Sequence, residues 1–428
     1  MMLEKITFKD QNSSIRDLIK QIKNGFKLQN LSIDEIENLS DSEKLEFIDS
    51  IILQPDYQRE YRYSIPDESL LVESLLLSIP IPPIFLANDR YNGIQVLNVV
   101  DGQHRLTAFY RYLNDEYALK DLKIRDDING KIYSKLHIDI KSKLISSTIQ
   151  QIIFKEFPGR DIELEIFNRY NKGTKPLTPQ EIRHAIYGSK TNKFVNQFSS
   201  ILFNRIENKS YIDFNVEEIV KLNTVYNVTE DRFLKKKIQE SIFVILSILE
   251  YGIQDQNKKS PEYAASYMEE KTNNEDELKK LERELDLSRE KNSSKTEIIL
   301  LEKKQKDQET LINDNFKKIK DRFFIFNKFI ILISKEIQFP FSRELYGISS
   351  RNYKFQISIA MILAGLTHKF IINNKKIDEL KDIKSVIKYI EETLLDSYLE
   401  DKNYNASSTN VTEMKALIEK IELTRLFN

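Results

Sequence analysis

Hydrophobic residues near position 100 change their spacing from that of a strand to that of a helix. The stretch IQVLNVV is apolar on both faces toward its end, which is typical of a buried strand. Beyond Gly102, the apolar residues Leu106, Phe109 and Leu113 recur at intervals of three and four positions, the spacing of one helix face. The pattern therefore predicts a strand that turns at Gly102 directly into a helix.

A second strand and two further helix starts flank this junction. The apolar run IFLA is typical of a strand, and a turn in NDRYNG joins it to IQVLNVV. Ser64, followed by Pro66 and two acidic residues, signals a helix start, because proline fits the first turn and acids favour the positive end of a helix. Thr178, with a proline after it and then Glu181, predicts a capping box. Residues 1–54 are predicted to be helical and polar.

From about residue 190 onward the pattern is almost wholly helical, and part of it is dense in charge. The leucines of LKKLERELDL recur at near-heptad spacing, but over too short a distance for a long coiled coil. This segment, about residues 255–320, predicts a charged helical hairpin. The predicted fold class is an α+β N-terminal domain with a small mixed sheet, residues 1–195, followed by a mainly α-helical C-terminal region, residues 196–428.

Composition narrows the class of protein. The chain has 428 residues, of which 40% are hydrophobic and 31% charged, as in ordinary globular proteins. Its formal net charge of −1 lacks the basic excess common in nucleic-acid-binding proteins, and the absence of cysteine excludes disulfides and thiolate chemistry. The chain start shows no secretory signal, and the longest apolar runs are too short to span a bilayer. We therefore expect a cytoplasmic protein without membrane contact.

The five residues DGQHR at the strand-to-helix turn carry the clearest candidate chemistry. The first amides of a helix lack intrahelical partners, and the helix dipole adds positive potential, so such a turn can hold an anion. Gly102 allows close backbone approach, Gln103 offers a neutral donor, and Arg105 can place a fork of donors on phosphate oxygens. His104 can act as a general base, and Asp101 can cap the helix or hold Mg²⁺.

A purely structural interpretation of the same residues remains open. Asp-Gly is a common turn, so Asp101 can be only a cap, and His104 and Arg105 can be ordinary exposed residues of a first helical turn. The chain contains neither the GxxxxGK[ST] loop of P-loop nucleotide sites nor the GxGxxG fingerprint of dinucleotide sites.

Four segments in a fixed order resemble a known family. PDYQREYRYS, LLLSIPIPPIFL, VVDGQHRLTAFYRYL and IFNRYNKGTKPLTPQEIRHA are similar to blocks of the N-terminal domain of the GmrSD restriction family, over about residues 15–195. The resemblance implies a fold related to ParB and sulfiredoxin, in which a strand–turn–helix binds or uses nucleotides. The sequence departs from the family at His104, because members of the family usually have glutamine at this position, in a DGQQR motif.

The resemblance and the chemistry of the residues together give a set of expected site residues. Asp101, His104 and Arg105 are expected to be catalytic; Asp101 and Arg105 match the family motif, whereas the roles of His104 and of Asp101 as a Mg²⁺ ligand come from the chemistry of these side chains. The residues expected to bind the nucleotide and its phosphates come from the DGQHR loop and from two other matching blocks: Gly102, Gln103, Arg105, Gln58, Arg59, Arg169 and Asn171.

By this resemblance, the protein is expected to be a nucleotide-binding, NTP-hydrolysing regulatory or sensor subunit of an anti-phage restriction system. Its expected partners are an NTP with Mg²⁺, DNA and, in an oligomer or complex, a separate nuclease effector. A separate effector is implied because His104, His137, His184 and His368, the four histidines of the chain, form no HNH nuclease pattern.

Two alternative functions stay open. In one, a ParB-like DNA-binding protein or nuclease uses the DGQHR loop on a DNA phosphate. In the other, a non-enzymatic adaptor recruits a nuclease through its helical region.

Overall fold

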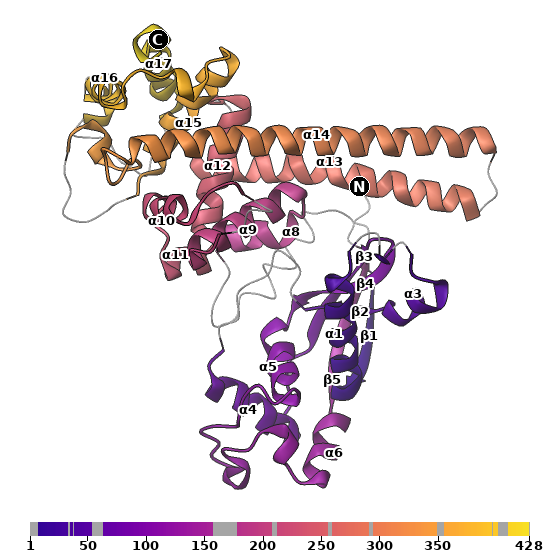
Figure 1. The fold of residues 1–428 in the computed structure, drawn as a ribbon. Helices are drawn as coiled ribbons and strands as arrows, with labels where there is room; N and C mark the ends of the chain where they lie inside the picture. Colours follow the sequence, from indigo (N-terminus) through magenta and orange to yellow (C-terminus); the bar gives the residue numbers. More distant parts are fainter. Residues whose placement is uncertain are drawn as a thin grey trace. The chain divides into compact units, whose positions relative to one another are not determined.

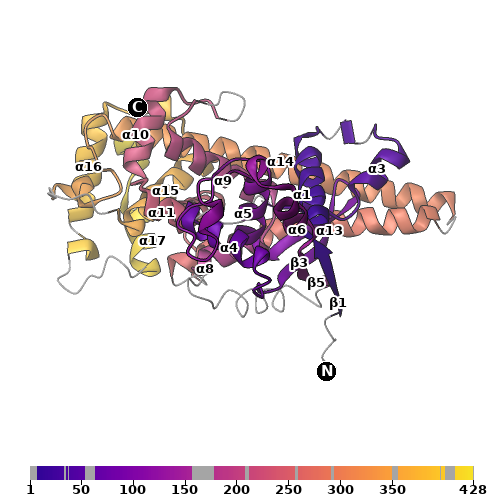
Figure 2. The ribbon, with the colours of Figure 1, turned by 90° about the horizontal axis from the view of Figure 1, so that it is seen from below.

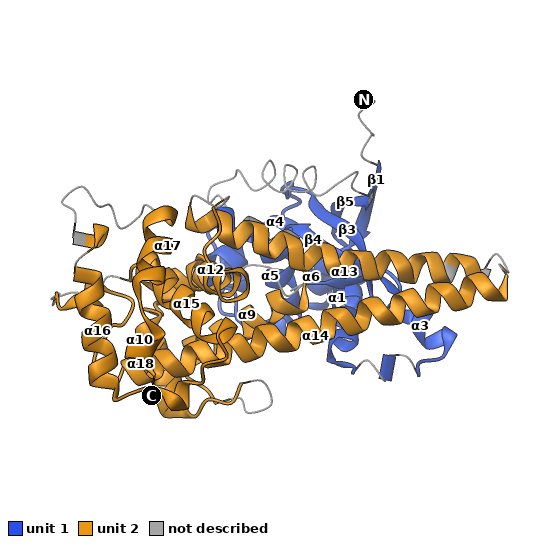
Figure 3. Cartoon of the chain, turned by 90° about the horizontal axis from the view of Figure 1, so that it is seen from above, with its two compact units in different colours: residues 1–186 blue, residues 187–428 orange. Residues whose placement is uncertain are grey.

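The protein divides into two compact units, residues 1–186 and residues 187–428, shown in blue and orange in Figure 3. Within the part of the chain described below, no helix is both long and apolar enough to cross a membrane. The computed structural model describes residues 7–32, 35–36, 38–53, 63–156, 178–207, 212–255, 259–290, 294–348, 355–395, 397–400 and 410–427.

The first unit contains a mixed five-stranded sheet in the order β1-β5-β3-β4-β2 (Figure 1). β1 pairs antiparallel with β5, and β3 antiparallel with β4, whereas β3 with β5 and β2 with β4 are parallel pairs. This mixed sheet confirms the predicted α+β character of the N-terminal region. The strands are β1 (Thr7–Ser14), β2 (Ser50–Ile52), β3 (Ile84–Tyr91), β4 (Ile94–Asp101) and β5 (Thr148–Glu156).

The β3–β4 hairpin shows why its sequence folds as predicted. Asn92 and Gly93 both have positive φ, 46° and 82°, as a two-residue turn of the favoured twist requires. β3 runs on to Tyr91, so the turn is shorter than the NDRYNG segment in which it was predicted.

The prediction of a helical chain start is wrong at two places. Residues 7–14 form β1 and residues 50–52 form β2, although α1 (Ile15–Asn30) and α3 (Asp41–Phe47) between them are helices. The sequence of β1, TFKDQNSS, has almost no apolar side chains, so hydrophobic spacing does not mark it as a strand. Its backbone pairs with β5, a segment remote in sequence, from Phe8 opposite Phe154 to Ser14 opposite Thr148.

Helices pack around the sheet to form the core of the first unit. α4 (Ile65–Leu76) begins at Ser64 with a reciprocal capping box to Asp67, as its sequence predicts. α5 (Gln103–Leu113), α6 (Ile138–Ser146) and α8 (Pro179–Ile186) follow. The main cluster of buried residues joins α1, α4 and α5 to β3 and β4 and includes Ile22, Val72, Leu86, Val99 and Phe109.

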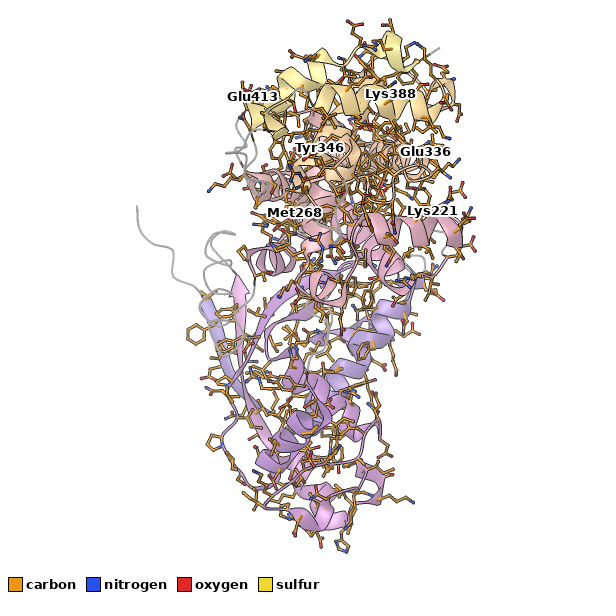
Figure 4. All side chains as sticks on the ribbon, turned by 90° about the vertical axis from the view of Figure 1, so that its left-hand side faces the viewer. Lys221, Met268, Glu336, Tyr346, Lys388 and Glu413 are labelled. Carbon is orange, nitrogen blue, oxygen red and sulfur yellow. The ribbon has the colours of Figure 1, made fainter. Side chains whose placement is uncertain are left out.

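The second unit is helical. Its innermost helices, α12 and α15, are buried along nearly their whole length. Figure 4 places Tyr346, which is fully buried, inside this unit, with Lys388 and Glu413 on its outside. The helices are α9 (Lys190–Asn204), α10 (Val216–Val225), α11 (Glu230–Leu234), α12 (Lys237–Tyr251), α13 (Ser260–Glu290), α14 (Lys295–Ile333), α15 (Ile357–Ile372), α16 (Ile383–Leu395), α17 (Val411–Lys420) and α18 (Leu423–Leu426).

The two longest helices, α13 and α14, form the charged helical hairpin. They run side by side over most of their length (Figures 1 and 2). Buried residues of α14, such as Ile312 and Ile319, recur at helical spacing on one face of the helix. The hairpin continues at its base into the core of the unit, where Phe326 and Ile330 of α14 are fully buried.

Candidate functional site

The candidate site lies where β4 becomes α5, at the DGQHR segment. β4 ends at Asp101 and α5 begins at Gln103, and Gly102 between them has a φ of 103° in the left-handed region. A Cβ atom at Gly102 would lie 3.2 Å from Ile84 Cγ1 and 3.3 Å from Arg105 Nη2. The left-handed backbone conformation therefore favours glycine here, and any larger residue would also press on Ile84 and Arg105.

Arg105 ties this turn to the polypeptide before β3. Its side chain is only 10% exposed. Nη2 donates to Asp101 Oδ2 at 2.6 Å, while Nη1 donates to the carbonyl oxygen of Pro82 and to that of Pro83, the latter at 3.1 Å. The prolines of the IPIPP segment thus present carbonyls that the guanidinium fork can reach. Arg105 therefore holds the strand end, the helix start and the chain before β3 in one arrangement.

Gln103, the first residue of α5, is a buried donor without a visible acceptor. It is 7% exposed, and among the described residues nothing accepts a hydrogen bond from its Nε2. Thr107, one turn further along the helix, is equally buried, and its Oγ1 also has no partner in the described part of the chain. Buried polar groups are nearly always hydrogen-bonded, so these two groups are candidates for binding a polar ligand.

His104 lies at the second position of α5, beside Tyr63. The two ring centroids are 4.9 Å apart, with the ring planes tilted by 41°. Sequence reasoning did not identify Tyr63 as part of this region, because it comes from the chain before α4 and meets His104 only through the fold. The contact fixes one side of the imidazole against an aromatic ring.

The electrostatics of the helix start favour an anion. The first turn of α5 contains no acidic residue, and it includes His104 and Arg105. The first intrahelical hydrogen bond runs from the Leu106 N–H to the Gly102 carbonyl oxygen at 3.0 Å. The amides before Leu106 belong to the positive end of the helix dipole. Within the described junction of β4 and α5, an anion beside Gly102 would thus meet backbone amides, and Asp101 is the carboxylate that borders them.

The structure brings only part of the predicted site together. Asp101, Gly102, Gln103, His104 and Arg105 lie within one turn of the same junction. The other predicted site residues lie outside the described residues: Gln58, Arg59, Arg169 and Asn171.

Asp101 is the one predicted metal ligand, and its surroundings are compatible with Mg²⁺. Its side chain is 32% exposed, and its Oδ2 accepts the hydrogen bond from Arg105. The described residues contain no cluster of three or more metal-binding side chains. Mg²⁺ commonly keeps several waters and uses one or two carboxylates together with substrate phosphates, so one exposed carboxylate suits Mg²⁺ only together with a phosphate ligand.

The sheet, the glycine turn and the helix start define an α+β domain with an anion site at a strand-to-helix junction. Residues 36–188 match the family described as the N-terminal domain of the GmrSD restriction endonuclease. The matched segment contains all four of the sequence blocks that resemble this family, so the match agrees with the resemblance seen in the sequence. Neither the curated proteins nor the solved structures give a match to this chain.

Proposed function

We propose that the protein is a nucleotide-binding, NTP-hydrolysing regulatory subunit of a phage restriction system, with a ParB-like first unit. One observation carries this proposal: the left-handed Gly102 opens a helix whose first residue, Gln103, buries an amide donor that has no partner among the described residues. A nucleotide phosphate supplies acceptors for that amide and for the backbone N–H groups of the first turn.

Each residue of the junction has a distinct part in this proposal. Gln103 Nε2 and the first-turn amides bind phosphate oxygens. Arg105 adds positive charge, and its bonds to Asp101 and to the proline carbonyls keep the turn in its binding conformation. His104 takes a proton from the attacking water through a ring nitrogen. Gln58, Arg59, Arg169 and Asn171, which lie outside the described residues, are proposed to contact the nucleotide only on the basis of the matching sequence blocks.

Asp101 would hold Mg²⁺ in this site together with the phosphate oxygens and water. The metal would supply positive charge that offsets the charge of the phosphates. In the same proposal, DNA or a separate nuclease chain binds the helical unit, because the four histidines of the sequence form no HNH pattern.

The test separates phosphate binding from folding. Gln103→Leu removes the amide but keeps the side-chain size, and replacing an unpaired buried polar group by an apolar one is close to neutral for stability. We expect NTPs with Mg²⁺ to raise the melting temperature of the wild type. We expect Gln103→Leu to keep the wild-type melting temperature without nucleotide and to lose affinity by roughly tenfold or more.

His104→Gln is the matched control, because it restores the glutamine usual in the family and leaves Gln103 in place. It should bind nucleotide as the wild type does, while phosphate release reports whether His104 is needed for hydrolysis. If no NTP shifts the melting temperature of the folded wild type, the proposal is wrong. A steeply salt-dependent affinity for DNA in that case would support the DNA-phosphate alternative.

A further inference from the structure

One side of the charged helical hairpin packs against α9. At the base of the hairpin, the Lys190 N–H of α9 donates to Glu275 Oε1 of α13 at 2.6 Å. The ring of Phe194, also in α9, lies 6.0 Å from the ring of Phe316 in α14. Both helices of the hairpin therefore present the same side to α9, and each has an opposite side that points away from it.

Exposed leucines lie on the side of the hairpin that points away from α9. Leu285 of α13 and Ile312 of α14 are 4% and 7% exposed, and they mark the face that each helix turns toward the other. Successive residues of an α-helix are rotated by about 100°. By this spacing, the side away from α9 includes three leucines that are 50%, 53% and 52% exposed, namely Leu287, Leu300 and Leu311. We call this surface the leucine flank.

Two contacts across the hairpin set the level of one helix relative to the other. Gln308 Nε2 donates to the Asn274 carbonyl oxygen at 3.0 Å, and Arg289 Nη2 lies 2.8 Å from Glu302 Oε1. The two helices run antiparallel, so residues further along α13 lie beside residues earlier in α14 (Figure 3). These contacts bracket the outer part of the hairpin, and they fix which residues of the two helices lie at the same level.

At this register, residues of matching chemistry lie level with one another on the leucine flank. Leu287 of α13 lies at about the level of Leu300 of α14, and Lys280 lies at about the level of Asp307. Lys280 and Asp307 are also exposed, and helical spacing places both on the leucine flank. One level of the flank thus carries two leucines, and another carries a cation and a carboxylate.

Such a flank is complementary to a second copy of itself. A two-fold axis along the hairpin places α14 of one copy over α13 of the other without changing the level of any residue. Leu287 of each copy then meets Leu300 of the other, and Lys280 meets Asp307, so every contact forms twice. Self-complementary contacts of this kind are what a two-fold symmetric dimer requires.

We propose that two copies of this chain associate through the leucine flank and form a four-helix bundle from their two hairpins. The flank spans residues 273–290 of α13 and 297–314 of α14, so it is about 27 Å long and about 20 Å wide. Such a contact buries about 1,000 Å² in total, near the lower limit of specific interfaces. We therefore expect a reversible dimer with a dissociation constant on the order of micromolar. The proposal concerns the second unit and does not depend on nucleotide binding at Gly102.

Sedimentation equilibrium of the full chain tests the proposal with a charge swap between Lys280 and Asp307. Lys280→Asp puts two pairs of like charges into the interface, and so does Asp307→Lys. We expect each single substitution to weaken the dimer by about tenfold. The double substitution restores opposite charges in both pairs, so it should return the dissociation constant to within about threefold of the wild-type value. Because both positions are exposed, these variants should keep the wild-type fold, which circular dichroism checks.

Leu300→Glu and Ile299→Glu form a matched pair that tests the apolar contact. Both residues are exposed and adjacent in α14, but helical spacing places Ile299, at 63% exposure, on the α9 side of the helix. Leu300→Glu should weaken the dimer by about tenfold or more, whereas Ile299→Glu should leave it unchanged. A wild type that stays monomeric at about 100 µM overturns the proposal. So does a dimer that Leu300→Glu does not weaken, an equal loss in Ile299→Glu, or a double charge swap that does not restore association.

Discussion

Removing the Arg105 side chain should loosen the junction between β4 and α5, whether or not a nucleotide binds there. The guanidinium makes three hydrogen bonds, one to the Asp101 carboxylate and two to the carbonyls of Pro82 and Pro83. Because the guanidinium is charged, all three are charge-assisted hydrogen bonds, a class that contributes about 1.5–3 kcal/mol each, less where water can replace the partner. Breaking a buried ion pair by removing one partner costs about 3–5 kcal/mol in all.

Because Asp101 is partly exposed, we expect the loss of stability on breaking its ion pair with Arg105 to lie at the lower end of the range of about 3–5 kcal/mol. The Asp101 side chain is 32% exposed, so water partly replaces the lost partner. We therefore expect Arg105→Ala to reduce the local free energy of unfolding by about 3 kcal/mol. Hydrogen exchange followed by mass spectrometry measures this change at the amides of β4 and α5, without assuming that the two units unfold together.

Arg125→Ala is the matched control, because Arg125 also pairs with an aspartate in the first unit, but at the surface. Its partner Asp127 is 54% exposed, so the pair should contribute no more than about 1 kcal/mol. If Arg105→Ala changes exchange in β4 and α5 no more than Arg125→Ala does, Arg105 does not hold the junction. The measurement also bears on function. If Arg105→Ala disorders the turn, it abolishes nucleotide binding even where Arg105 itself does not contact the nucleotide.

Three further substitutions probe other parts of the structure. Gly102→Ala places a Cβ in a left-handed backbone conformation beside Ile84, so we expect it to destabilise the first unit by about 1–3 kcal/mol, and unchanged hydrogen exchange in α5 would contradict this. Lys271 is 7% exposed and its Nζ bonds to Glu250 at 2.9 Å and Glu270 at 3.0 Å, so Lys271→Met leaves two carboxylates without their cation. Circular dichroism should show a melting temperature of the second unit lower by roughly 5–12 °C, and a wild-type value would exclude a stabilising role. Burial raises the pKa of Glu275 above its ordinary value of 4.5. The folded state then binds this proton more tightly than the unfolded state, so the contribution of Glu275 to stability is lost as the pH rises from 4.5 through the raised pKa. Glu275→Gln should therefore lessen the loss of stability to urea over that pH interval, and identical pH profiles would refute the assignment.

Signals close together in the chain determined much of the first unit. The Asn92–Gly93 turn, the cap at Ser64 and the change of spacing at Gly102 each depend on residues within a few positions of one another. Turn and cap conformations depend mainly on local sterics and local hydrogen bonds, so they are visible in the sequence. The DGQHR segment was identified in this way, and it lies within residues 36–188, the part of the chain that matches the family model.

Only the tertiary structure determined which residues that are far apart in the sequence come into contact. β1 is polar and becomes a strand because β5 offers it backbone partners more than a hundred positions away, a pairing that hydrophobic spacing does not encode. The same holds for Arg105, whose bonds to Pro82 and Pro83 depend on how β3 and β4 pair. The sequence by itself therefore determined the local elements and the candidate loop. Long-range packing decided the sheet order, the partners of Arg105 and the buried amide of Gln103, because burial and pairing depend on the whole fold.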